Sequence, residues 1–110
     1  MAYDAALAER LRDLLTQMQP AFTEKAMFGG LSFLVHGNMC CGVVGDELIV
    51  RVGKGGAAEA LEQPGARPMD FTGRPMAGWV TITPVGTGSD DSLARWVRRG
   101  LDFVGHLPVK

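Results

Sequence analysis

Cysteine is scarce in this sequence: there are two, Cys40 and Cys41, and they are adjacent. Neighbouring cysteines cannot clamp distant parts of a chain, so a disulfide framework is excluded and a reducing compartment is indicated. Histidine is equally rare, with only His36 and His106. Because consecutive strand residues project to opposite faces, Cys40 and Cys41 are not expected to converge on one ion with His36. We therefore expect no metal site, and one of the two cysteines in the core.

Long apolar runs are also missing. The chain opens with Met1, Ala2 and Tyr3 rather than with a basic segment and an apolar stretch. No run approaches the ~18 apolar residues that a membrane-spanning helix needs. The sequence therefore predicts no signal peptide, no membrane contact and a cytoplasmic location.

No charge of one sign dominates. Lys and Arg number 11 against 12 Asp and Glu, which gives a formal net charge of -1. A protein that binds nucleic acid by neutralising many phosphates needs a concentrated basic surface. Nucleic-acid binding by this chain alone is therefore disfavoured.

Signatures of catalysis are absent as well. The sequence has no G-x-S-x-G elbow, no H-E-x-x-H motif and no paired carboxylates. The acidic and hydroxyl residues that stand out suit turns, strand edges or helix caps: Glu24, Asp46, Glu47, Asp70 and Ser89. We therefore expect no catalytic residues and no cofactor, and an enzyme is disfavoured.

What is present is enough apolar sequence for one core. Of the 110 residues, 46% are hydrophobic, and this length is typical of one domain, here residues 1–110. Two segments carry apolar residues at the spacing of an amphipathic helix. The first covers residues 4–18 with Asp4 as its N-cap, and the second follows the N-cap Ser89. Their apolar positions are Leu7, Leu11, Leu14, Leu15 and Met18, and Leu93, Trp96, Val97, Gly100, Leu101 and Val104.

The middle of the chain has the composition of strands. Residues 25–35 are predicted to be one extended segment with a bulge or sharp bend at Gly29 and Gly30. Two further strands, at residues 39–44 and 47–52, follow after tight turns. Three strands joined by short turns predict an antiparallel meander.

The remaining segments complete the predicted fold. A short helix is expected at residues 57–62, a turn-rich segment at 65–74, a further strand at 76–83 and a linker at 84–88. Runs of strands flanked by helices predict an α+β fold. Its sheet is an antiparallel meander of about four to five strands, with N-terminal and C-terminal amphipathic helices and a short middle helix.

A glycine-rich turn is the first candidate site. Residues 53–58 read Gly-Lys-Gly-Gly-Ala-Ala and match G-x-G-x-x-A between a strand and a helix. In a dinucleotide-binding turn, Gly53, Lys54 and Gly55 would approach an anion or nucleotide. That fingerprint needs a parallel strand-helix-strand unit, however, whereas the strands here are predicted to form hairpins. A plain strand-to-helix turn is the simpler interpretation, and nucleotide binding is kept as the alternative.

Three basic residues of the predicted sheet form the second candidate site. Lys25, Arg51 and Arg74 flank the strands or lie in them. They would form a small cationic surface if the strands bring them together. Basic residues on strands also protect sheet edges from unwanted pairing, which is the simpler interpretation.

The last helix carries a basic stripe of Arg95, Arg98 and Arg99. The stripe could contact an acidic partner or phosphates, and nucleic-acid binding through it is the least favoured idea at this net charge. A solvated helix face is the simpler interpretation, because Asp91 with Arg95, and Arg98 with Asp102, have the i,i+4 spacing of local ion pairs.

Several segments together resemble one protein family. They are the amphipathic first helix, the stretch Lys-Ala-Met-Phe-Gly-Gly-Leu at residues 25–31, Leu-Ile-Val-Arg-Val at 48–52, Phe-Thr-Gly-Arg-Pro-Met at 71–76, and the closing helix with Trp96. Over roughly residues 8–105 the chain is similar to the N-terminal domain of the TfoX/Sxy proteins, regulators of bacterial natural competence. The Met-Phe-Gly-Gly stretch and the Leu-x-x-Arg strand are the most specific parts of the likeness.

The resemblance implies an α+β fold and a bacterial cytoplasmic protein with a regulatory role linked to competence or transcription; it does not imply catalysis. Of the residues it covers, Lys25 and Arg51 suit a partner-facing surface. Where the family usually shows paired tyrosines, this chain has Gly78 and Trp79. We therefore expect a non-enzymatic adaptor domain that binds another protein, through a sheet edge or the surface around Lys25 and Arg51. An exposed edge would equally support a homodimer. The alternative is a small-molecule or nucleotide-binding domain, an enzyme included, that uses residues 53–58.

Overall fold

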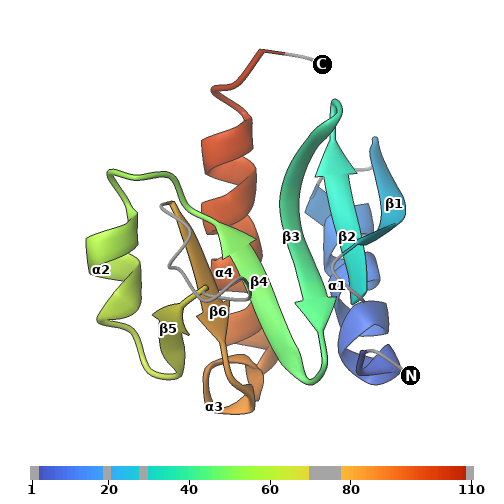
Figure 1. The fold of residues 1–110 in the computed structure, drawn as a ribbon. Helices are drawn as coiled ribbons and strands as arrows, with labels where there is room; N and C mark the ends of the chain where they lie inside the picture. The colour runs from blue at the N-terminus through green and yellow to red at the C-terminus, as the bar shows by residue number, and fades with distance from the viewer. Residues whose placement is uncertain (1–2, 19–20, 28–29, 70–77, 109–110) are drawn as a thin grey trace.

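The computed structural model describes residues 3–18, 21–27, 30–69 and 78–108 (Figure 1). In chain order the elements are α1 (Ala5–Met18), β1 (Phe22–Met27), β2 (Gly30–Val35), β3 (Asn38–Val44), β4 (Glu47–Arg51), α2 (Ala57–Leu61), β5 (Ala66–Pro68), β6 (Trp79–Ile82), α3 (Pro84–Thr87) and α4 (Asp90–Val104). The fold is α+β, as the sequence predicts. No helix among these residues is long and apolar enough to cross a membrane.

Both amphipathic helices form where the sequence predicts them and begin at the predicted caps. The Asp4 carboxylate accepts hydrogen bonds from the backbone N–H groups of Ala6 at 2.9 Å and Leu7 at 3.2 Å. The Ser89 hydroxyl accepts one from the backbone N–H of Ser92 at 3.1 Å. These bonds satisfy N–H groups that have no partner within the helix, which is worth about 1 kcal/mol per cap. In Figure 1 both helices lie behind the sheet, so they cover the same face of it.

The core lies between these helices and one face of the sheet. Leu48 and Val50 of β4 and Val80 of β6 are fully buried, in one cluster with Trp96 and Val97 of α4. Burying a side chain of this kind stabilises the fold by about 1.5–3 kcal/mol. The alternating spacing in the strands and the helical spacing in α4 therefore bring their apolar faces together.

Among the described residues the sheet has six strands in the order β1-β2-β3-β4-β6-β5, and all neighbours are antiparallel. β2 to β4 form the predicted three-stranded meander, and β1 adds a fourth strand that was not predicted separately. β2 and β3 are joined at His36 and Gly37, whose φ values of 53° and 83° fit a two-residue type I′ hairpin turn. Within the part of the chain that the structure describes, β1 and β5 are the two edges of this sheet.

The prediction of one bent segment at residues 25–35 is wrong. The chain reverses there, so that Met27 of β1 lies opposite Gly30 of β2. A Cβ at Gly30 would collide with the carbonyl oxygen of Val43 on β3. Close approach of two backbones therefore explains this glycine.

A β-bulge lies instead in β3, at the cysteines. The register against β2 shifts so that Cys40 is the extra residue between Met39 and Cys41. A bulge re-aims side chains, and both cysteines are fully buried in the same core cluster. Cys40 lies under α4, where a Cβ at Gly100 would come within 2.8 Å of its Sγ. The expectation that the two cysteines project to opposite faces is therefore wrong, because strict alternation holds only in a regular strand.

Two segments after the middle helix differ from the prediction. Helix α2 forms as expected. Strand β5, however, lies within the segment predicted to be turn-rich. It was not predicted because a strand of three residues that includes a proline is too short to show an alternating pattern. The predicted linker at 84–88 contains the short helix α3, which Pro84 begins in the first-turn position that proline favours. The strand predicted from residue 76 is described from Trp79 onward; residues 76 and 77 lie outside the described part of the chain.

Candidate functional site

A cationic side chain held between two aromatic rings lies at the end of β4. The guanidinium carbon of Arg51 is 5.5 Å from the ring centroid of Trp79 and 5.3 Å from that of Phe103. Trp79 is the cross-strand neighbour of Arg51 on β6, and Phe103 comes from the last turn of α4. Cation–π attraction of this kind is worth about 0.5–1 kcal/mol where it is exposed. The side chain of Arg51 has no hydrogen bond or ion pair with a described residue, so within that part of the chain its guanidinium N–H donors are available.

Two glycines make room for this cluster. Gly53 and Gly78 have φ values of 79° and 84°, in the left-handed region that side chains rarely adopt. The carbonyl oxygen of Gly78 accepts hydrogen bonds from the backbone N–H groups of Val52 at 2.8 Å and Gly53 at 3.0 Å, which fixes the start of the turn. A cavity of about 360 Å³, here called the Arg51 cleft, is lined by Arg51, Gly53, Lys54, Gly78, Trp79 and Phe103.

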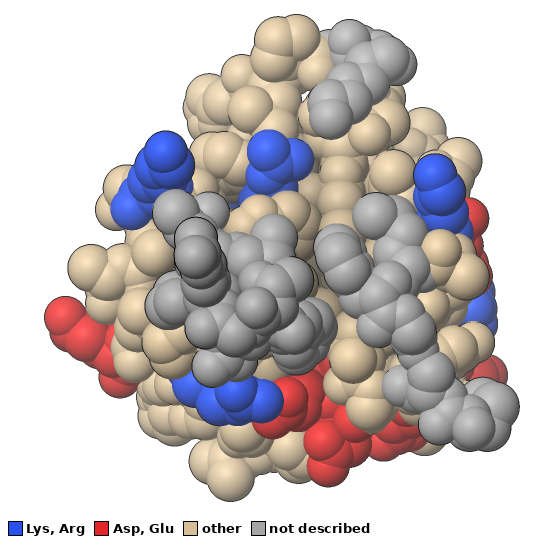
Figure 2. Space-filling model, viewed as in Figure 1, with Lys and Arg blue, Asp and Glu red and all other residues tan. Residues whose placement is uncertain are grey.

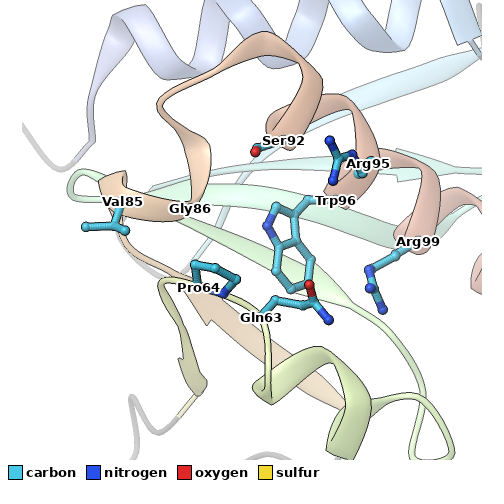
Figure 3. A pocket seen from close by; sticks show the side chains of 8 residues that line it. All are labelled: Gln63, Pro64, Val85, Gly86, Ser92, Arg95, Trp96 and Arg99. Atoms are coloured by element: carbon cyan, nitrogen blue, oxygen red, sulfur yellow. The ribbon is translucent and has the colours of Figure 1, made fainter.

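A second cavity, of about 150 Å³, lies between α4, α3 and the connection from α2 to β5. Figure 3 shows the Trp96 ring in it, with Gln63 and Pro64 on the opposite side from the helix. Val85 stands at its rim with 78% of its surface exposed. We call it the Trp96 pocket; its lining residues are Gln63, Pro64, Val85, Gly86, Ser92, Arg95, Trp96 and Arg99.

Arg99 joins α4 to α2 next to this pocket. Its Nη1 and Nη2 atoms donate to the two carboxylate oxygens of Glu59, each at 2.9 Å, and its guanidinium carbon lies 5.1 Å from the Trp96 ring centroid. The hydrogen bonds from Arg99, and then its charge, lower the pKa of Glu59. Because such exposed pairs add little to stability, the main effect of the bidentate geometry is to fix the position of the Arg99 side chain.

A third depression connects the other two. It measures about 300 Å³ and is lined by Val52, Gly56, Arg99, Asp102, Phe103 and His106. It shares Arg99 with the Trp96 pocket and Phe103 with the Arg51 cleft. The lining positions of α4 and the turn after it recur at helical spacing. The three depressions therefore form one band along a side of α4, which we call the α4 groove.

The α4 groove is cationic although the chain as a whole is not. Arg51, Lys54, Arg95 and Arg99 line it, against the carboxylate of Asp102 and the Glu59 that pairs with Arg99. A concave surface lined by charges of one sign attracts ligands of the opposite sign. Guanidinium groups bind the planar carboxylate or the phosphate group with paired hydrogen bonds. The chemistry that this arrangement supports is therefore the binding of anions.

Metal binding has no comparable support in the structure. Among the described residues there is no group of three or more His, Cys, Asp or Glu side chains placed to hold a metal ion. The thiol of Cys41 is inside the core, where a hydrogen-bond interaction with Cys40, followed by burial, raises its pKa well above the usual value of about 9.0.

The structure does not assemble the cationic surface that the sequence suggested. Arg51 lies in the α4 groove, but Lys25 is exposed on β1 opposite Ser32. Because β2 and β3 lie between β1 and β4, the two strands that carry Lys25 and Arg51 are about 14 Å apart across the sheet at the usual strand spacing. Arg74 lies outside the described residues. Figure 2 accordingly shows Lys and Arg as separate groups around this face of the molecule.

The glycine-rich turn is divided by the fold. Gly53 and Lys54 line the Arg51 cleft, whereas Gly55 is exposed and outside it. The turn joins a strand with two antiparallel neighbours to a helix of five residues. It therefore lacks the parallel unit on which the dinucleotide fingerprint depends.

The basic stripe of α4 is also divided. Arg95 and Arg99 line the groove, whereas Arg98 is exposed and does not. The expected i,i+4 ion pairs of Arg95 and Arg98 are not among the ion pairs of the described residues. Arg99 bonds to Glu59 of another element, a contact that spacing along one helix cannot predict.

Sequence reasoning missed the two aromatic residues of the Arg51 cleft. Phe103 follows Arg99 at i+4 and Trp96 at i+7, so helical spacing alone carried a signal that these three share one side of α4. The contact of Trp79 with Arg51 depends on the register of β4 against β6, and this register cannot be read from the sequence.

Comparison with known proteins identifies a family for most of the chain. Residues 13–104 match the family model described as TfoX N-terminal domain. The matched range includes Arg51, Trp79, Arg95, Arg99 and Phe103 of the α4 groove. No curated protein and no solved structure matches the chain.

Proposed function

The chain belongs to the TfoX N-terminal domain family, which is associated with competence regulation, and from this premise we propose that it is a non-enzymatic regulatory adaptor. It acts by binding an acidic segment of another protein in the Arg51 cleft. Regulation by an adaptor requires a surface prepared for a partner rather than a reaction centre. The Arg51 cleft supplies such a surface.

The single observation that carries the proposal is the placement of Arg51. Trp79 and Phe103 hold its guanidinium in position, while its N–H donors have no partner among the described residues. Arginine and tryptophan in a concave surface are typical of the residues that dominate the energy of protein interfaces. Because the guanidinium is already ordered, binding a carboxylate there costs less entropy than ordering a free side chain would.

The sheet edge at β1 offers a second kind of partner surface, for a strand of another protein or of a second copy. β1 is a six-residue edge strand, and its residues from 23 to 26 are exposed. An open edge can accept a further strand through backbone hydrogen bonds. Lys25 lies on this strand, so a variant at that position tests the edge separately from the cleft.

The test compares charge reversals of equal size at the two surfaces. Tagged wild-type protein, Arg51→Glu and Lys25→Glu are used to capture partners from the native cell lysate after nuclease treatment, with identification by mass spectrometry. A specific protein retained by wild type and Lys25→Glu but lost by Arg51→Glu supports the cleft. If the partner is lost with Lys25→Glu alone, the adaptor surface is the β1 edge and not the cleft. If neither variant changes the capture of the partner, both surfaces are ruled out.

The alternative, a small-molecule or nucleotide ligand at the same turn, has its own measurement. ATP is titrated to millimolar concentration while thermal stability is followed, because a ligand that binds only the folded state must raise it. An increase that is lost in Lys54→Ala would favour this alternative over the adaptor.

A further inference from the structure

We infer that the α4 groove holds an extended peptide segment at two points, with one acidic side chain in the Arg51 cleft and a second at Arg95 in the Trp96 pocket. This inference rests on the proposed function, and it adds the second subsite and the spacing of the partner's acidic residues.

The separation of the two subsites along the axis of α4 follows from the positions of their residues on the helix. Phe103, which packs on Arg51, is eight residues beyond Arg95, and both line the α4 groove. At the rise of an α-helix this corresponds to about 12 Å. In an extended peptide, residues i and i+4 point to the same side and lie about 13 Å apart. Two acidic residues separated by three others therefore fit the groove.

The Trp96 pocket has the chemistry of an anion subsite. The side chain of Arg95 lines it and has no hydrogen bond or ion pair with any described residue. Arg99 is the other cation in this pocket. Its Nη1 and Nη2 atoms already donate to the two carboxylate oxygens of Glu59, each at 2.9 Å. The Arg99–Glu59 pair is an example, within this molecule, of an arginine beside the groove that binds a carboxylate. Because Arg99 is engaged in this pair, Arg95 is the cation of the pocket that a partner can bind.

The rim of the Trp96 pocket adds an apolar contact. Val85, 78% exposed, is one of two large hydrophobic residues that are exposed among the described residues. Figure 3 shows it at the end of the pocket away from Arg99. An apolar side chain next to the second acidic residue of the partner would cover Val85 and so remove apolar surface from water.

The two tryptophans report on the two subsites separately. The chain has only Trp79, in the Arg51 cleft, and Trp96, in the second pocket. Their indole N–H signals are followed by NMR on the whole chain and assigned with Trp79→Phe. The probe is a blocked peptide, Glu-Ser-Ser-Ser-Glu, and the control is its isomer Glu-Glu-Ser-Ser-Ser, which has the same charge but cannot reach both subsites.

The expected result is that the spaced peptide shifts both indole signals with one common affinity, about tenfold tighter than the isomer. A charge-assisted contact of about 1.4 kcal/mol corresponds to that factor. Arg95→Gln should abolish the Trp96 shift and reduce affinity about tenfold, and Arg98→Gln, a charge change on α4 outside the groove, should leave both unchanged.

Two outcomes overturn the inference in distinguishable ways. If Trp79 shifts equally with both peptides and Trp96 does not shift, the second subsite is wrong while the proposed function stands. If neither signal shifts with either peptide at 10 mM (on the order of the weakest useful contacts), the acidic-segment assignment fails at both points.

Discussion

Gly53 lies directly against the ring of Phe103: a Cβ at position 53 would come within 2.5 Å of the Phe103 Cε1 atom. The same glycine has a φ of 79° and donates its N–H to the carbonyl oxygen of Gly78 at 3.0 Å. Since Phe103 in turn holds Arg51, the backbone of the turn positions the cation of the cleft. The glycine is thus required by a contact between the strand-to-helix turn and α4.

Gly53→Ala is expected to destabilise the fold by about 1–3 kcal/mol, because it combines a collision with Phe103 and an unfavourable φ. Gly55→Ala is the matched control. Position 55 has no heavy atom within 4 Å of an added Cβ and no positive φ, so its change should lie between neutral and about 1 kcal/mol stabilising. Urea unfolding measures both, and equal effects would contradict the contact described above.

The two cysteines are expected to resist a thiol reagent such as DTNB in the native protein and to react quickly in urea, because both are fully buried. The pKa of Cys41 is raised in the folded state by the interaction with Cys40 and by burial. The contribution of this thiol to stability should therefore be constant below about pH 9, where it is protonated in both states, and fall above that pH as the thiol of the unfolded chain ionises. Cys41→Ala should show a shallower alkaline decline, and rapid native-state labelling would contradict the buried placement.

The Glu59 carboxylate should titrate below its usual range, because hydrogen bonds from Arg99 and then its charge favour the ionised form. Its pKa is lower in the folded than in the unfolded state. The linked stabilisation is therefore present above the unfolded pKa and is lost as pH falls through the folded one. In an NMR titration, Arg99→Gln should raise the pKa of Glu59 toward its ordinary value of 4.5, while the hydrogen bond from Gln63 continues to lower it. If the variant leaves the titration unchanged, the ion pair does not form in solution.

Val85→Ser should leave the free energy of unfolding within about 0.5 kcal/mol of wild type, because the side chain is exposed and supports no packing. If Val85 contacts the partner, the same variant should weaken capture of that partner. Thermal unfolding and the capture assay together separate the two effects. A large loss of stability would show that Val85 is buried in solution.

The periodic elements were predictable from sequence, and the irregular ones were not. α1 and α4 follow from their apolar spacing and from Asp4 and Ser89 as caps. The reversal between β1 and β2 was missed because adjacent glycines signal a bend without giving its angle. The bulge at Cys40 was missed because an inserted residue leaves no mark in the pattern of a short strand.

The candidate site was only partly predictable for a related reason. Arg51 and Lys54 were singled out, but Lys25 was placed with Arg51 because sequence gives no distance across a sheet. Trp79 was recognised as a strand residue but not as a partner of Arg51. These contacts join residues far apart in the chain, and no spacing rule within one element reaches that far.

The sequence by itself determined the class of fold, the positions of the long helices and the family to which the chain belongs, because these depend on local periodicity, capping and short motifs. Only the tertiary structure decided which cations converge. Arg51, Phe103 and Trp79 meet because the register of β4 against β6 and the packing of α4 on the sheet place three distant segments at one corner. Burial of apolar faces sets that arrangement, and the charged side chains at the rim are positioned as its consequence.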